Sequence, residues 1–331
     1  VAQDPFKVDQ VQIEPGSGDT ILINRHSDGS LKFKDAVVTS GLVLSQLANL
    51  STIEGVYIVG RGGFAQYTTL QSALDVIPSG SSSAEPSLIL MLPGVYTETI
   101  TIIRDGVTIV GLGHVVIRSL LEETPDAVGA THTISILQSG TTPLRVDLVN
   151  LTITNSHTAK ACIYTTGADI LTLGLNLKDC VLDATSSSGN FTLSAVCVNR
   201  ITIGGGRVGG GDYDQLKLYG VAEFEAYQVS RMGAVLCRWD NDATVPSFDP
   251  APHVYRNCDV ALNSTLQNSF ILEDPASVSM QYCTLGDTTL AGVDCTYTFE
   301  KCVMDALAIT ALSTCNVVVK QTLTRSTLPS N

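Results

Sequence analysis

An all-β solenoid is the fold class that this sequence predicts, and three observations lead to it. Short β-rich phrases recur along most of the chain, and the helices that a doubly wound sheet needs for its crossovers are missing between them. One phrase with a central cysteine repeats at intervals typical of stacked coils. Only 15% of the 331 residues are charged and 6% are aromatic, which suits coils that stack and bury an inward row of side chains.

The first 58 residues are predicted to form a separate unit. Residues 1–35 contain short alternating phrases between turn residues, which indicates small strands. Residues 39–50 favour a short helix, because three leucines share one of its faces: Leu44, Leu47 and Leu50. A helix of that length is marginal in water, so we expect it to pack against another element or another copy of the chain.

Residues 59–331 are predicted to form the solenoid. Its entrance is a helix over residues 68–77, which Thr68 or Thr69 can cap and which Pro78 ends. A buried strand follows, and after it no other convincing helix is found. The remaining phrases favour short strands, among them residues 99–103, 107–111, 115–117 and 133–137.

One five-residue phrase repeats along the solenoid. Its copies are residues 178–182, 256–260, 281–285 and 300–304, with 149–153 as a copy that has Leu in place of Cys. The central cysteines are separated by 78, 25 and 19 residues, and the first gap equals about three coils of roughly 26 residues. We therefore predict that four thiols point into the core from equivalent positions: Cys180, Cys258, Cys283 and Cys302.

The nine cysteines are predicted to be buried free thiols. Their number is odd, no Cys-x-x-Cys pair suggests zinc, and most lie in β-like phrases where Cys acts as a small hydrophobe. The alternative, a secreted disulfide scaffold, suits shorter chains.

Charge and hydropathy exclude several partners. The formal net charge is −13, which is unsuited to a basic nucleic-acid surface or to anionic lipid. No run approaches the roughly 18 apolar residues of a membrane helix, and no basic start precedes an apolar stretch. We expect neither a nucleic-acid nor a membrane partner, and no signal peptide.

Residues 67–74, 89–98 and 107–113 resemble the opening of right-handed parallel β-helix proteins such as pectin methylesterases and pectate-lyase-like proteins. The shared features are a capping helix, a Gly-x-Tyr-x-Glu turn and an apolar phrase ending in Gly-x-Gly, and many viral spikes share this entrance. The resemblance implies a right-handed parallel β-helix in which Tyr96 and Glu98 close the first coil. It does not extend to the esterase's chemistry, because the Asp-Phe-(Ile/Val)-Phe-Gly and Leu-Gly-Arg-Pro-Trp phrases are missing.

Residues 29–35 and 37–47 resemble the segments that precede β-helices in bacteriophage tail and virion proteins. In those proteins a short strand-and-helix neck joins the particle-binding end to the β-helix and often makes a trimer. The resemblance implies that residues 1–58 attach to capsid or tail proteins and hold a homotrimer. The protein would then be made in the host cytoplasm and reside in the virion.

Two acidic loops are the candidate glycan contacts. Asp212 and Asp214 follow a glycine-rich stretch, and Trp239 lies beside Asp240 and Asp242. An exposed indole can stack on a sugar ring, and paired carboxylates can bind a cation or hydrolyse a glycoside. The alternative for both is an ordinary loop, at a coil corner or against a neighbouring subunit.

The leading hypothesis is a non-enzymatic structural protein of a bacteriophage particle, a tail-spike, fibre-like or capsid-decorating homotrimer that could contact host surface polysaccharide. The alternative is a polysaccharide lyase or glycoside hydrolase with a β-helix fold. Its acids would come from different coils and would be invisible as a sequence motif. The five histidines lack metal spacing and no hydrolase motif occurs, so we assign no catalytic residue, metal or cofactor.

Overall fold

The chain divides into two compact units, Val1–Leu50 and Ser51–Asn331. The structure, a computed structural model, describes residues 10–13, 21–25, 31–34, 55–61, 65–78, 86–119, 131–138, 142–156, 160–167, 172–184, 191–209, 215–232, 234–238, 253–260, 264–267, 276–285, 288–291, 295–304, 307–310 and 316–324. The helix predicted over residues 39–50 lies outside these ranges. The predicted boundary between residues 58 and 59 falls inside β4 (Val56–Val59), which pairs with the strand of the next coil.

The described part of the first unit is a three-stranded antiparallel sheet. It consists of β1 (Gln10–Ile13), β2 (Ile21–Arg25) and β3 (Leu31–Lys34), with β2 in the middle.

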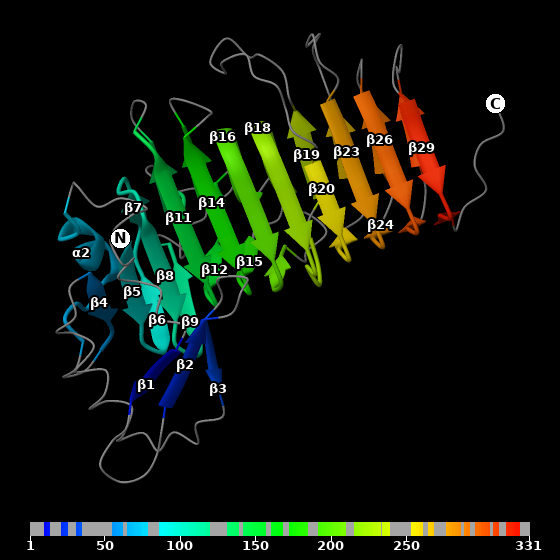
Figure 1. Ribbon diagram of the computed structural model, residues 1–331. Coiled ribbons are helices and arrows are strands. Elements are labelled where there is room, and N and C mark those ends of the chain that lie inside the picture. Colours follow the sequence, from blue (N-terminus) through cyan, green and yellow to red (C-terminus); the bar gives the residue numbers. More distant parts are fainter. Residues whose placement is uncertain are drawn as a thin grey trace, which may run out of the picture. The chain divides into compact units, whose positions relative to one another are not determined.

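The second unit is a right-handed parallel β-helix (Figure 1). Each coil contributes strands to three columns, and each strand pairs in parallel with its counterparts in the neighbouring coils. Column A contains β4, β5 (Ser87–Met91), β8 (Val107–Gly111), β11 (Leu144–Val149), β14 (Leu173–Lys178), β20 (His253–Arg256), β23 (Ala276–Gln281), β26 (Cys295–Glu300) and β29 (Asn316–Lys320).

Column B follows column A in each coil. It contains β6 (Gly94–Thr97), β9 (Val115–Arg118), β12 (Thr152–Asn155), β15 (Val181–Ala184), β17 (Arg207–Val208), β21 (Asp259–Val260), β24 (Thr284–Leu285), β27 (Val303–Met304) and β30 (Leu323–Thr324). Single bridges through Met232 join β17 to β21 and make the column continuous.

Column C closes each coil. It contains β7 (Ile100–Ile102), β10 (Ile134–Leu137), β13 (Ala161–Thr166), β19 (Ala234–Arg238), β22 (Ser264–Gln267), β25 (Thr288–Ala291) and β28 (Leu307–Thr310). Two long strands, β16 (Phe191–Gly204) and β18 (Gln215–Tyr227), run from column C into column A without a loop. They turn the corner at single residues with positive φ, Cys197 at 54° and Gly220 at 61°.

The corner between columns A and B is a short turn that repeats from coil to coil. One residue takes a left-handed conformation with φ between 49° and 55°, and the residue after it points inward. The left-handed residues other than glycine are Asn150, Asp179, Gln228, Asn257, Tyr282, Lys301 and Gln321. Backbone bonds tie successive turns together; for example, the amide of Asn257 donates to the carbonyl of Gln281 at 3.0 Å. This turn explains the repeated five-residue phrase.

The predicted cysteine positions are confirmed. Cys180, Cys258, Cys283 and Cys302 each follow a left-handed residue and are at most 2% exposed, and Leu151 takes the same place in an earlier coil. The six cysteines whose side chains the structure describes are buried thiols that form no disulfide, as predicted. The side chains of three others, Cys237, Cys295 and Cys315, lie outside the described residues.

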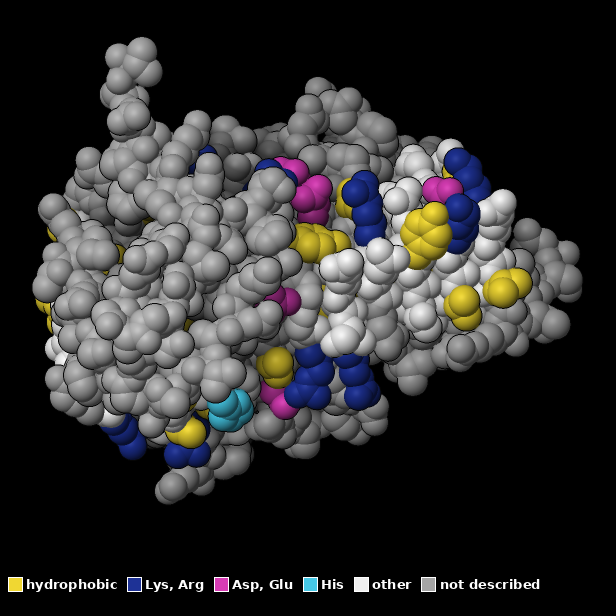
Figure 2. Space-filling model, turned by 60° about the horizontal axis from the view of Figure 1, so that its bottom comes forward, with side chains coloured by type: hydrophobic (Ala, Val, Ile, Leu, Met, Phe, Trp, Pro, Cys, Tyr) yellow, Lys and Arg dark blue, Asp and Glu magenta, His cyan; other side chains and the backbone are white. Residues whose placement is uncertain are grey.

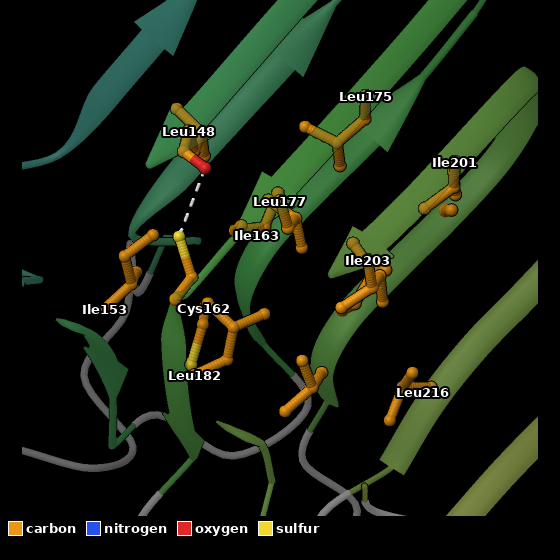
Figure 3. Close-up of a cluster of buried hydrophobic side chains, with 14 of the residues drawn as sticks. Leu148, Ile153, Cys162, Ile163, Leu175, Leu177, Leu182, Ile201, Ile203 and Leu216 are labelled. Carbon is orange, nitrogen blue, oxygen red and sulfur yellow. Dashed lines mark hydrogen bonds between the residues drawn. The ribbon is translucent and has the colours of Figure 1, made fainter. Parts of the chain in front are cut away.

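The interior of the stack is filled by rows of aliphatic side chains (Figure 3). Leu148, Leu177 and Ile203 occupy one register position in three successive coils of column A, and all are at most 1% exposed. Column B contributes a facing row that includes Ile153 and Leu182. Each coil buries its inward face only against its neighbours, so the core is continuous along the stack.

A short helix, α2 (Leu70–Asp75), covers the entrance of the β-helix. Thr69 caps it as predicted, and Glu98 reaches back to the same end, where its two carboxylate oxygens accept from the amides of Leu70 at 2.9 Å and Gln71 at 3.1 Å. The Tyr96 hydroxyl donates to the carbonyl of Leu92 at 2.7 Å. Tyr96 and Glu98 therefore close the first coil, as the resemblance implied. In the described residues, no helix is long and apolar enough to cross a membrane.

Candidate functional site

Ligand contacts in this fold come from outward side chains and from loops, because the inward rows fill the described interior. The residues predicted as glycan contacts belong to two such loops. Asp212 and Asp214 lie in the connection between β17 and β18, and Trp239, Asp240 and Asp242 in the one between β19 and β20. All five lie outside the described residues.

The described strands that adjoin these two loops lie side by side. The first loop ends where β18 begins at Gln215, and the second starts where β19 ends at Arg238. β18 pairs with β19 in parallel from Gln215 to Tyr219. The outward face of column C at this pair is therefore the described surface closest in sequence to both predicted loops.

That face carries a cluster of one lysine and two aromatic rings, Phe191, Lys217 and Tyr219, which we call the Lys217 cluster. The Lys217 ammonium lies 4.4 Å from the ring centre of Tyr219 and 6.0 Å from that of Phe191. All three side chains are half-buried. A cation against ring faces is attracted by their π electrons, which holds the ammonium on the outer surface of the sheet.

A second aromatic pair lies on the same face, two coils toward the entrance. Tyr164 shares its register row with Lys217, and the ring of His132 stacks on it at 4.4 Å between centres, 13° from parallel. The Nδ1 atom of His132 accepts from the amide of Ala161 at 2.9 Å. Burial, aided by the nearby positive charge of Lys160, lowers the pKa of His132 to about 4, so the imidazole is neutral near pH 7 and supports the Tyr164 ring.

The outward face of column A carries a charged cluster. Arg200 lies 3.6 Å from the Glu223 carboxylate and 3.1 Å from the Glu225 carboxylate, and all three side chains are partly exposed. Asp147 lies on the same face. Burial raises the pKa of its carboxyl group, and hydrogen bonds such as the one that Thr108 donates at 3.4 Å lower it by less. The two glutamates lie at alternate positions of β18, so a single arginine contacts both carboxylates and the three side chains keep a net charge of −1.

Neither cluster was identified from the sequence, although a signal for both was present. Residues 216–219 and 223–227 alternate between buried and more exposed positions on either side of a corner, and the more exposed ones include Lys217, Glu223 and Glu225. Reading this segment as one strand would have placed them on the surface. It would not have shown that Phe191 and Arg200, on β16, lie beside them, because that depends on the register between coils.

The strand pairing places the chain among right-handed parallel β-helix proteins. Solved structures found similar include pectin methylesterase from Aspergillus niger in a penultimately deglycosylated form, at 14% identity and TM-score 0.44, covering 82% of this chain and 86% of that one. The deglycosylated form of the same enzyme gives 15% identity and TM-score 0.37 with the same coverage. ORF18 of Geobacillus virus E2 gives 12% identity and TM-score 0.36, covering 93% of this chain and 68% of that one.

No family model matches the sequence, and no curated protein matches it. Among the described residues, no group of three or more His, Cys, Asp or Glu side chains is placed to hold a metal ion.

Proposed function

We propose that the protein is a structural, non-enzymatic component of a bacteriophage particle, a spike, fibre-like or decorating homotrimer. The observation that carries the proposal is the uninterrupted stack of coils, in which side-chain rows and turn hydrogen bonds repeat in register. Such a stack resists bending because its strands pair from coil to coil and its described inward rows are closely packed. A stiff element with free outer faces suits a protein that projects from a particle.

In this proposal residues 1–58 attach the protein to capsid or tail proteins and hold the trimer. The support comes from the sequence: the segment resembles the necks of virion proteins, and its leucines at 44, 47 and 50 share one helical face. Small units that lack a core of their own generally need oligomerisation.

Light scattering on the full chain tests the assembly. We expect a mass of three times 35.0 kDa at micromolar concentration, and a mass near 35.0 kDa for the double variant Leu44→Asp, Leu47→Asp. The exposed change Thr68→Asp, at the entrance of the β-helix, is a matched control and should leave the mass unchanged. A monomeric unmodified protein would refute the trimer.

Membership of a particle is tested separately. Antibodies raised against the purified protein should label intact particles from lysates of the source culture, at a constant number of copies per particle. Signal only in the soluble fraction of the lysate would contradict the proposal.

The alternative function is a polysaccharide lyase or glycoside hydrolase. One observation favours it: the Lys217 cluster lies on the strands that adjoin both acidic loops. There an ammonium could neutralise a sugar carboxylate while loop acids exchange protons with the glycosidic bond. New reducing ends from bacterial capsule or pectin, lost in Lys217→Gln but kept in the control Lys178→Gln, would establish the enzyme and overturn the non-enzymatic proposal.

A further inference from the structure

An exposed strip of two tyrosines and three cations runs along the corner between columns A and B. We call it the tyrosine strip, and its members are Tyr227, Arg256, Tyr282, Lys301 and Lys320. The tyrosines are 42% and 55% exposed, and the three cationic side chains are exposed. Figure 2 shows Lys and Arg side chains beside hydrophobic ones on the face that it draws, with Asp or Glu side chains among them.

Tyr282 occupies a backbone position that disfavours it. Its φ is 55°, in the left-handed region, where the matching residues of the other coils are Asn150, Asp179, Gly205, Gln228, Asn257, Lys301 and Gln321. Asn and Asp adopt this conformation readily, whereas a bulky side chain there is uncommon. More than half of the Tyr282 surface is exposed, so packing does not account for an aromatic residue at this turn. Tyr282 is the one aromatic residue among the described left-handed residues of this corner, and its exposed ring is available to a ligand.

The Tyr282 ring is held in place before any ligand arrives. The Lys301 ammonium, one coil further on, donates to the Tyr282 hydroxyl at 3.0 Å and lies 5.0 Å from the ring centre. This contact restrains both side chains, so less conformational entropy is lost when a ligand binds.

The Tyr227 ring is held against the backbone of the preceding coil by a different local arrangement. A Cβ atom at Gly204, its register partner in the preceding coil, would overlap the Tyr227 ring. The ring therefore lies against bare backbone, and much of its surface is open to solvent. Two independent local arrangements thus present rigid aromatic surfaces along one corner.

Spacing and polar groups indicate the ligand's chemistry. Neighbouring coils lie about 4.8 Å apart, so residues two coils apart, such as Tyr227 and Tyr282, are separated by about 10 Å along the stack. Arg256 pairs in register with Tyr227 and is followed by Asn257, whereas the side-chain amide of Gln281 already donates to the Glu300 carboxylate at 3.3 Å. Guanidinium and amide groups donate to carboxylates and hydroxyls.

We propose that the tyrosine strip binds an acidic polysaccharide, with sugar rings stacked on Tyr227 and Tyr282 and sugar carboxylates at Arg256 and Lys301. The apolar faces of sugar rings match exposed tyrosines. The cations of the strip favour binding of an anion at this corner. The net charge of the chain is −13, so the protein as a whole has no general affinity for polyanions. The site lies away from the predicted loops and is independent of whether the protein belongs to a particle.

Titration calorimetry with paired probes tests the site. Oligomannuronate and uncharged mannan oligosaccharide of the same length differ in their carboxylates, and single-stranded oligothymidylate tests for a general polyanion site. We expect oligomannuronate to bind, more weakly as salt is raised, and the uncharged probe to bind more weakly at low salt. Arg256→Gln should reduce the difference between the two sugars.

Tyr282→Asn is the decisive variant, because Asn fits the left-handed turn and the fold should be retained by circular dichroism. We expect it to weaken oligomannuronate binding about tenfold. Gln321→Asn changes the same turn position two coils away and should bind as the unmodified protein does. No binding of oligomannuronate, full affinity in Tyr282→Asn, or stronger binding of oligothymidylate would each overturn the proposal, and none of these results bears on particle membership.

Discussion

Lowering the pH should destabilise the β-helix through a single buried imidazole. His253 is fully buried in an inward row of column A, between Phe224 and Val278 in register, and its Nε2 donates to the carbonyl of Val221 at 3.0 Å. Burial lowers the pKa of His253 to about 4, against a weaker opposing effect of that hydrogen bond. Protonation would place a positive charge in an apolar row, so the folded state holds the imidazole neutral.

The sign and size of the effect follow from linkage. The unfolded chain takes up a proton near pH 6.5 and the folded chain only near pH 4, so His253 stabilises the fold fully above pH 6.5 and loses that contribution as pH falls toward 4. The complete window between the two pKa values corresponds to about 3 kcal/mol of the free energy of unfolding, and the fall from pH 7 to pH 5 to about 2 kcal/mol. Ordinary carboxylates stay ionised in both states over the upper part of this range.

Urea denaturation between pH 7 and pH 5 measures this loss. We expect the midpoint to fall by about 0.5–1 M in the unmodified protein. His253→Phe keeps a ring in the row and should show a smaller fall, whereas His114→Asn, which alters an exposed histidine, should behave as the unmodified protein does. Burial also lowers the pKa of the half-buried His132 to about 4, so this residue contributes the part of the fall that His253→Phe retains. A midpoint that does not change with pH, or an undiminished fall in His253→Phe, would refute this reasoning.

Three further predictions concern the elements that build the stack. Glu98→Ala removes the acceptor for two amides at the start of α2 and should lower the free energy of unfolding by about 1–2 kcal/mol in urea melts, while Glu98→Gln should lose less. Gly206→Ala puts a Cβ against the Cys180 carbonyl oxygen at a φ of 67° and should cost more than about 2 kcal/mol. Gly174→Ala, whose Cβ would make only ordinary van der Waals contacts, the nearest at 3.7 Å to the Arg145 side chain, should be tolerated; equal stability of the two would contradict this account. Thiol counting in denaturant without reductant should find close to nine free cysteines, and a count near one would show disulfides.

Residues that build the coils could be located from the sequence, because their pattern is local. The cap at Thr69, the Tyr96 and Glu98 closure and the inward cysteines all depend on spacing within one coil or on a phrase that repeats. The helix is shorter than predicted, Leu70–Asp75 instead of 68–77, because Thr69 is still extended and Val76 is already the C-cap. Ile77 is buried although it lies beyond the end of the helix. The apolar pattern that predicted the helix therefore extends past its last turn.

Surface clusters could not be located in this way, because they depend on register between coils of unequal length. Lys217 meets Phe191, and Arg200 meets Glu223, only because β16 and β18 pair with a fixed offset. Neither segment alone indicates the register between β16 and β18, because that register depends on the number of residues in the loop after Val208. The candidate contacts predicted from the sequence were therefore loop residues. The clusters on the outward faces of the described strands could not be predicted from any single segment.

The turn between columns A and B connects stability with surface chemistry. Seven residues other than glycine hold left-handed backbones there, each at a cost of about 1–3 kcal/mol, less for Asn and Asp. Hydrogen bonds from one turn to the next, such as the Tyr282 amide to the Glu300 carbonyl at 3.0 Å, offset that cost in every coil. Because the next residue fills the core, the left-handed residue is free to vary in its side chain. The stack thereby displays one variable side chain per coil at a regular spacing. Tyr282, which occupies this position in its coil, adds an aromatic surface without altering the core beneath it.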